Sequence, residues 1–236
     1  MSHYEARAKS LRYGEDVIEN SGILSKVYGY MSVALFITAF IAYQVMTSVS
    51  TVAWFQAHPG VFLLLILGEL GLVILISAGL KSMSFPALLG AFVVYSGANG
   101  ITLGVAVSIY TKASVCGTFV SCAMMFGALS IYGLVTKRNL DSVGDFCMMG
   151  LFGLLAMLIV NIFVASRAMD WLITAFGLIV FIGLTAYDTQ KLKEIARNGL
   201  FGRQGAQKMA LIGALSLYLD FVNLFLYLLR LFGVKK

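Results

Sequence analysis

Three acidic residues lie inside long apolar runs of this chain: Glu69, Asp188 and Asp220. None of them has a Lys or Arg within one helical turn that lies equally deep in its run, so no ion pair within a helix neutralises it. A carboxylate in apolar surroundings is costly unless it faces another charge, a cation or water, or holds a proton. These positions therefore indicate a role in handling protons or cations.

Carboxylates brought close together have a characteristic chemistry. Two of them cannot both ionise cheaply, so the pair shares a proton and titrates as a unit. Two or three carboxylates, with carbonyl groups and water, also suit Ca²⁺, which takes about 6–8 oxygen ligands. Such a pair is a natural pH sensor, and we expect Asp188, Asp220 and Glu69 to make weak Ca²⁺ contacts.

Asp220 belongs to a polar stripe. Ser216, Asp220, Asn223 and Tyr227 are spaced by four, three and four residues, which places them on one helical face. Such a stripe on an apolar helix faces a bundle interior or a water-filled cavity. We expect Asn223 to hydrogen-bond to the Asp220 carboxylate or to a neighbouring helix. The alternative interpretation is a stripe of interhelical hydrogen bonds that only holds the bundle together.

The surroundings of the other two carboxylates, Asp188 and Glu69, indicate a functional role less strongly than those of Asp220. A similar line ends at Asp188, but Asp188 lies one turn before Lys191, and an interfacial position is the alternative for it. Glu69 has Gly68 and Gly71 near it, which leaves room for a neighbouring helix or water. The line that ends at Asp188 consists of Thr174, Gly177, Phe181, Thr185 and Asp188.

The composition defines the class of protein. Of 236 residues, 60% are hydrophobic and 12% charged, against about 45–50% and about 25% in soluble domains. This excludes disorder and argues against a water-soluble globule. The net charge is +6, but most Lys and Arg lie in short segments between apolar runs, so we expect a lipid bilayer and no nucleic acid as partner.

Seven apolar runs are long enough to cross a membrane, which takes about 20 residues. They predict an all-α integral membrane protein, a seven-helix bundle over residues 23–236 preceded by a polar segment, residues 1–22. We expect Ser142 and Asp145 to form a capping box before the fifth helix, and Asp170 to cap the sixth. The runs are 23–46, 61–80, 85–110, 113–135, 146–166, 170–191 and 209–229.

Small residues recur within these runs. Gly97, Gly100 and Gly104 lie three and four residues apart on one side of the third helix. This spacing lets helix backbones approach closely, and we expect it to serve packing and not ligand binding.

Loop charges predict the orientation. A cytoplasmic N-terminus leaves only Lys112 and Arg167 in outside loops, which agrees with the positive-inside rule. If the seventh run spans the membrane, Lys235 and Lys236 end outside, and if it dips and returns they end inside. The basic residues placed inside are Arg7, Lys9, Arg12, Lys81, Lys137, Arg138, Lys191, Lys193, Arg197, Arg203 and Lys208.

Two segments carry a family resemblance. Gly183–Lys193 (GLTAYDTQKLK) and Ala214–Phe225 (ALSLYLDFVNLF) resemble the signature segments of the Bax inhibitor-1 family, also called the transmembrane Bax inhibitor motif family. The similarity covers nearly the whole chain, includes Gly133–Leu140 (GLVTKRNL), and is typical of the bacterial inner-membrane branch.

The resemblance implies a seven-helix fold whose last helix is surrounded by the other six, and a pH-dependent leak of cations, chiefly Ca²⁺. It implies that Asp188 and Asp220 are the pH-sensor pair and that Glu69 contributes to the pore. A basic residue on the second helix latches the closed state in some members, and Lys81 is the nearest candidate here.

The spacing alone does not bring the two aspartates together. Along their helices, Asp188 lies about 5 Å from Lys191 and Asp220 about 18 Å from Lys208. On straight helices whose basic ends lie at equal depth the carboxylates would not meet. Either Lys191 snorkels to the interface or the seventh helix starts deeper than its neighbours, so the proximity is an implication of the resemblance.

Two other classes of membrane protein lack a residue or motif that they require. An intramembrane aspartyl protease needs a GxGD motif, but Leu217, Tyr218 and Leu219 precede Asp220. A retinal protein needs a lysine in the last helix, which has none between Lys208 and Lys235. We expect no enzyme and no cofactor.

The histidines and cysteines do not form a metal site or a disulfide framework. A zinc hydrolase needs clustered histidines, and the only two, His3 and His58, lie in different segments. Cys116, Cys122 and Cys147 form no CxxC motif and are expected to be buried thiols. Two non-enzymatic alternatives stay open: a regulatory membrane protein that binds a membrane protease or stress partner, and a proton-coupled transporter.

Overall fold

The computed structural model describes residues 22–80, 82–198 and 203–236. The described residues form eight helices, and seven of these are long and apolar enough to cross a membrane. The eighth is a short helix, α3 (Val49–Ala57), which the sequence did not predict. The expected all-helical membrane architecture is confirmed. The polar N-terminal segment predicted for residues 1–22 lies outside the described residues, apart from Gly22.

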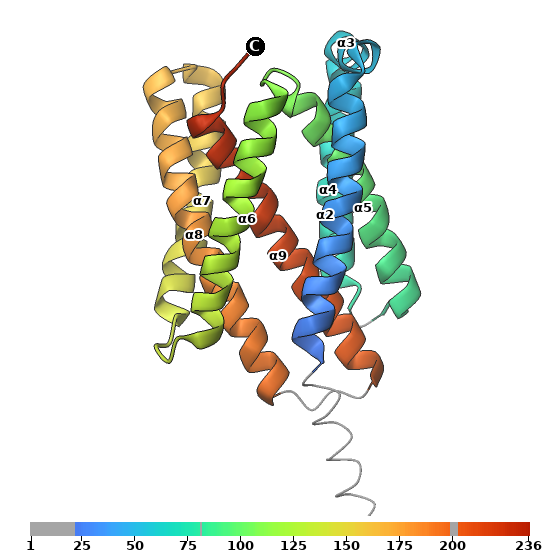
Figure 1. Ribbon diagram of the computed structural model, residues 1–236, viewed down its shortest axis with the longest axis vertical. Coiled ribbons are helices and arrows are strands. Elements are labelled where there is room, and N and C mark those ends of the chain that lie inside the picture. Colours follow the sequence, from blue (N-terminus) through green and yellow to red (C-terminus); the bar gives the residue numbers. More distant parts are fainter. Residues whose placement is uncertain (1–21, 81, 199–202) are drawn as a thin grey trace, which may run out of the picture. The chain divides into compact units, whose positions relative to one another are not determined.

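The chain divides into two compact units, Met1–Ser108 with Leu192–Leu215, and Ile109–Lys191 with Ser216–Lys236. In the first unit, α2, α4 and α5 lie side by side, and in the second, α6, α7 and α8 do (Figure 1). Helices α8 and α9 contribute residues to both units. The bounds are α2 (Ile23–Thr47), α4 (Pro59–Ala78), α5 (Phe85–Val107), α6 (Lys112–Val135), α7 (Asp141–Val164), α8 (Arg167–Asn198) and α9 (Arg203–Phe232).

Local chemistry sets several helix starts. The Ser48 hydroxyl accepts a hydrogen bond from the Thr51 N–H at the start of α3, and the Thr111 hydroxyl accepts one from the Ser114 N–H at the start of α6. These bonds satisfy backbone donors that have no partner within the helix. Pro59 occupies the first turn of α4, where its missing N–H costs little.

Two predicted helix caps were wrong. Helix α7 begins at Asp141, and no side chain caps it, so the capping box of Ser142 and Asp145 does not form. Helix α8 begins at Arg167, which leaves Asp170 in its first turn. A tight turn accounts for the second difference, because Ala165 adopts a left-handed conformation that ends α7 two residues before α8 begins.

Close backbone approach joins α2 to α5, as the glycine spacing predicted. A Cβ atom at Gly100 would lie 2.9 Å from the carbonyl oxygen of Thr38, and one at Gly104 would lie 2.6 Å from Cβ of Val45. Gly97 is looser, with its nearest neighbour 3.6 Å away. Glycine is therefore required for the packing at two of the three positions.

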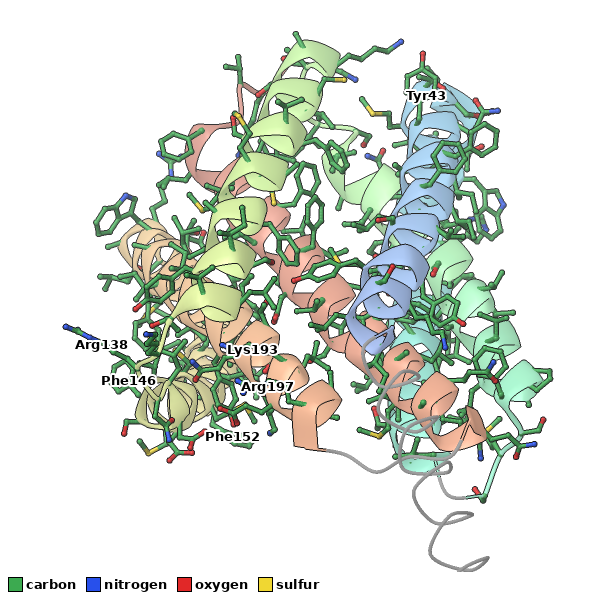
Figure 2. All side chains as sticks on the ribbon, turned by 60° about the horizontal axis from the view of Figure 1, so that its bottom comes forward. Tyr43, Arg138, Phe146, Phe152, Lys193 and Arg197 are labelled. Carbon is green, nitrogen blue, oxygen red and sulfur yellow. The ribbon has the colours of Figure 1, made fainter. Side chains whose placement is uncertain are left out.

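Helix α9 is the most deeply buried candidate span. In its most apolar stretch 67% of the residues are buried, whereas no other candidate span exceeds 39%. By contrast, the other helices expose large apolar side chains, such as Phe146 and Phe152 of α7 (Figure 2), as lipid-facing surfaces do.

The last helix runs its full length without turning back. After α9, the backbone of the C-terminal residues pairs with the segment before α6: the Thr111 N–H donates to the Val234 carbonyl, and the Lys236 N–H donates to the Ile109 carbonyl. The C-terminus therefore lies at the same end of its unit as Lys112, which excludes the alternative in which the seventh run dips and returns.

Candidate functional site

The centre of the candidate site is the line along which α8 packs against α9. The Ser216 hydroxyl of α9 donates a hydrogen bond to Oδ2 of Asp188 in α8. Further along, the Tyr227 ring of α9 stacks on the Phe181 ring of α8. Residue numbers fall on α8 as they rise on α9, so the two helices run antiparallel, and the two faces predicted from the sequence meet.

Asp220 lies between these two contacts. It follows Ser216 by one helical turn, about 6 Å along the axis, and the charge of Asp188 acts on it electrostatically. The structure therefore brings Asp188, Ser216 and Asp220 into one cluster within the second unit. The helix spacing did not predict this contact, because the apolar run that carries Asp188 ends at Lys191. Helix α8 instead continues to Asn198, so Asp188 lies further from the end of its helix.

The two carboxylates have different surroundings. Asp188 is partly exposed, accepts the Ser216 hydrogen bond and is influenced by Lys191 on its own helix. Asp220 is 4% exposed, and its Oδ2 accepts no hydrogen bond from any described residue. A buried oxygen without a donor is unfavourable for an ionised carboxylate unless a proton or a cation occupies the place of the donor.

Two buried thiols also lie near this cluster. Cys147 of α7 lies within electrostatic range of Asp220, and its Sγ packs where a Cβ at Gly183 would stand. The Cys122 thiol of α6 donates to the carbonyl of Phe221 at 3.7 Å. Both are buried free cysteines, as expected, whereas Cys116 is exposed, contrary to expectation.

The remaining members of the polar stripe have structural contacts. The Asn223 side-chain amide donates to the Leu219 carbonyl at 2.8 Å within α9. The expected hydrogen bond from this amide to Asp220 or to a neighbouring helix is therefore wrong, because the helix's own backbone offers a nearer acceptor. Tyr227 contributes its ring, stacked on Phe181, to the interface with α8.

Glu69 lies in the first unit and has its own partners there. The Asn99 amide donates to Oε2 of Glu69 at 3.2 Å, and the Thr102 hydroxyl donates to Oε1. Glu69 and Ile76 are the buried residues of α4, so this carboxylate sits at the contact of α4 with α5. Asn99 and Thr102 were not predicted as its partners, although two polar residues three apart in an apolar run are a signal that the sequence contains.

Gln190 was also missed, although it belongs to the first signature segment. Its Oε1 accepts from the Leu140 N–H and its Nε2 donates to the Arg138 carbonyl, both at 2.8 Å. These two hydrogen bonds join the segment between α6 and α7 to α8. Two other residues of the signature segment also pack against neighbouring helices. Ala186 contacts Gly133 of α6, and the Tyr187 ring contacts Gly144 of α7. Much of this segment serves packing.

Two predicted roles are not supported by a described contact. Lys81, the latch candidate, lies outside the described residues. Within residues 22–80, 82–198 and 203–236, no cluster of three or more His, Cys, Asp or Glu side chains could hold a metal ion. The second unit thus has two neighbouring carboxylates, Asp188 and Asp220, and the first unit has one, Glu69, with the Thr102 and Asn99 side chains beside it.

The sequence is similar to those of known membrane proteins. A sequence model of the family described as "Inhibitor of apoptosis-promoting Bax1" matches residues 20–236. The chain is 41% identical to "Inner membrane protein YbhL" of Escherichia coli over 214 residues, 90% of this chain and 92% of that protein. It is 35% identical to an uncharacterized protein of Borreliella burgdorferi over 222 residues, 94% and 96% of the two chains.

Proposed function

The chain belongs to the Bax inhibitor-1 family, and from this premise we propose that it is a pH-regulated leak for cations, chiefly Ca²⁺, and not an enzyme. The single observation that carries the proposal is the cluster of Asp188, Ser216 and Asp220, in which a buried carboxylate oxygen of Asp220 has no hydrogen-bond donor among the described residues. Such a group inside a membrane protein favours a proton or cation pathway.

The electrostatics of the pair supply the regulation. Two neighbouring carboxylates in apolar surroundings share a proton, and the pair changes charge as a unit. Protons and Ca²⁺ compete for the same oxygen atoms, so the passage of cations depends on pH. Lys191 and Ser216 act on Asp188, and Cys147 lies within electrostatic range of Asp220.

The membrane and its orientation belong to the proposal. The relative in Escherichia coli is named an inner membrane protein, and the positive-inside rule favours a cytoplasmic N-terminus. We therefore propose a multi-pass protein of a bacterial inner membrane, whose C-terminus lies on the outer side because it shares an end with Lys112.

The test is Ca²⁺ flux into liposomes that contain only the purified protein, measured on both sides of neutral pH. The wild type should show a pH-dependent flux, and Asp220→Asn should lose the pH dependence because asparagine cannot ionise. Asp145→Asn is the matched control, since Asp145 is exposed on α7. An unchanged pH profile in Asp220→Asn would remove the sensor assignment.

A result without flux would point elsewhere. If the purified wild type conducts no cation at any pH, the leak is wrong, and the remaining interpretation is a regulatory membrane protein that binds a membrane protease or stress partner. In that case Asp188 and Asp220 would be structural, and Asp220→Asn would change only the stability of the protein.

A further inference from the structure

An aromatic pair lies on the same face of α9 as the buried carboxylate of Asp220. The centroids of the Phe181 and Tyr227 rings lie 5.7 Å apart with an interplanar angle of 28°, and both residues are buried. Gly177 makes room for this stack, because a Cβ atom there would come within 2.4 Å of the Tyr227 ring. The Tyr227 ring therefore sits directly against the backbone of α8.

The position of the stack relative to Asp220 follows from helix geometry. Tyr227 lies seven residues beyond Asp220, almost two turns and about 10 Å further along the same face of α9. On the other side, one turn away, is the hydrogen bond between Ser216 and Asp188. Asp220 thus lies between the Ser216–Asp188 hydrogen bond, towards the start of α9, and the aromatic stack, towards its end.

Aromatic side chains also cover the neighbouring face of α9. The Phe221 ring packs edge-on against Phe119 and Phe126 of α6, and Phe225 packs against Phe119. These contacts pack α6 against the face of α9 next to the stripe. A path that followed the stripe from Asp220 to the C-terminal end of α9 would therefore pass the Phe181–Tyr227 stack.

We propose that Phe181 and Tyr227 form a hydrophobic gate between the aspartate pair and the C-terminal end of α9. Apolar constrictions stop ions by excluding water, without any fixed charge. Because the two rings come from different helices, a small separation of α8 and α9 would part them and let water enter the space between them. This gate rests on the proposed leak. In it, the two aspartates sense pH, and the two rings form the barrier to the ion.

The test uses Ca²⁺ flux into liposomes at the pH at which the wild type conducts least. Tyr227→Ala and Phe181→Leu should each raise this flux several-fold, because each removes one ring of the stack. The pH midpoint should stay within error of the wild type, since both aspartates remain. Phe152→Ala is the control, because Phe152 is an exposed aromatic residue of α7 (Figure 2) and should leave the flux unchanged.

The outcomes separate the gate from the leak. Wild-type flux with no increase in either ring variant would overturn the gate and leave the leak intact. An increase in both, with an unaltered pH midpoint, supports the gate, and a shifted midpoint would show that the rings act through the aspartates instead. Flux in neither the wild type nor the variants would overturn both proposals. Because Phe181→Leu keeps most of the side-chain volume, it tests the gate even if Tyr227→Ala fails to fold.

Discussion

The hydroxyl of Ser216 donates a hydrogen bond to the carboxylate of Asp188, and this bond joins α9 to α8 one helical turn from Asp220. It makes the two aspartates unequal, since Asp188 has a donor and Oδ2 of Asp220 has none among the described residues. An unequal pair has one site that keeps its negative charge and one that exchanges a proton.

Removing this hydrogen bond should move the pH response. In Ser216→Ala, the charged form of Asp188 loses a donor that stabilises it, so the pair should bind its proton more readily. The midpoint of the pH dependence of Ca²⁺ flux in liposomes is expected to move to higher pH. Ser121→Ala is the control, because Ser121 is exposed on α6 and bonds to the Gly117 carbonyl of its own helix. A midpoint that stays in place would show that Ser216 does not act on the pair.

The charge of Glu69 should matter to the size of the flux. Glu69→Gln is expected to lower Ca²⁺ flux at every pH with the midpoint preserved, because the aspartate pair is intact. Thr102→Val removes a hydrogen bond to the carboxylate but keeps its charge, so it should lower the flux less. Glu194→Gln, at an exposed position of α8, provides the control. Equal fluxes in Glu69→Gln and the wild type would leave Glu69 as a structural link between α4 and α5.

The contact of α2 with α5 should tolerate no side chain at Gly100. Gly100→Ala places a methyl group 2.8 Å from Cβ of Ile41 and 2.9 Å from the Thr38 carbonyl oxygen, and neither neighbour is the end of a flexible chain. Such overpacking costs about 1–3 kcal/mol, so thermal unfolding in detergent should occur at a lower temperature. Gly97→Ala is the matched control on the same helix, because its nearest neighbour would lie 3.6 Å away. Equal melting temperatures for the two variants would argue against the close approach.

Gln190 should contribute to stability through the connection between α6 and α7. Gln190→Ala leaves the buried Leu140 N–H and the Arg138 carbonyl without their partner. A buried polar group left unsatisfied costs about 1–3 kcal/mol, so the variant should unfold at a lower temperature and its α6–α7 connection should be cut sooner by protease. Gln204→Ala, at an exposed position of α9, should behave as the wild type. Unchanged proteolysis in Gln190→Ala would contradict this role.

The helices could be predicted because their signal is local. A run of apolar residues of sufficient length must form its backbone hydrogen bonds internally in lipid, so α2, α4, α5 and α6 begin within two residues of their predicted starts. Helices α7, α8 and α9 begin three to six residues before their predicted starts, because contacts that apolar runs do not encode help to set the ends of helices. The Leu140 N–H, for example, is satisfied by Gln190, 50 residues away in the sequence.

The sequence alone determined which groups must be unusual: a carboxylate in an apolar run is costly wherever the helix packs, so Glu69, Asp188 and Asp220 stood out before any fold was known. Their partners depended on the tertiary structure, because hydrogen bonds and ring contacts between helices follow from depth and register, which periodicity does not contain. The extension of α8 to Asn198 set the register that joins Asp188 to Ser216 and stacks Phe181 on Tyr227. In the first unit, the packing of α4 on α5 placed Asn99 and Thr102 beside Glu69. In α9, the Asn223 amide bonded to the backbone of its own helix.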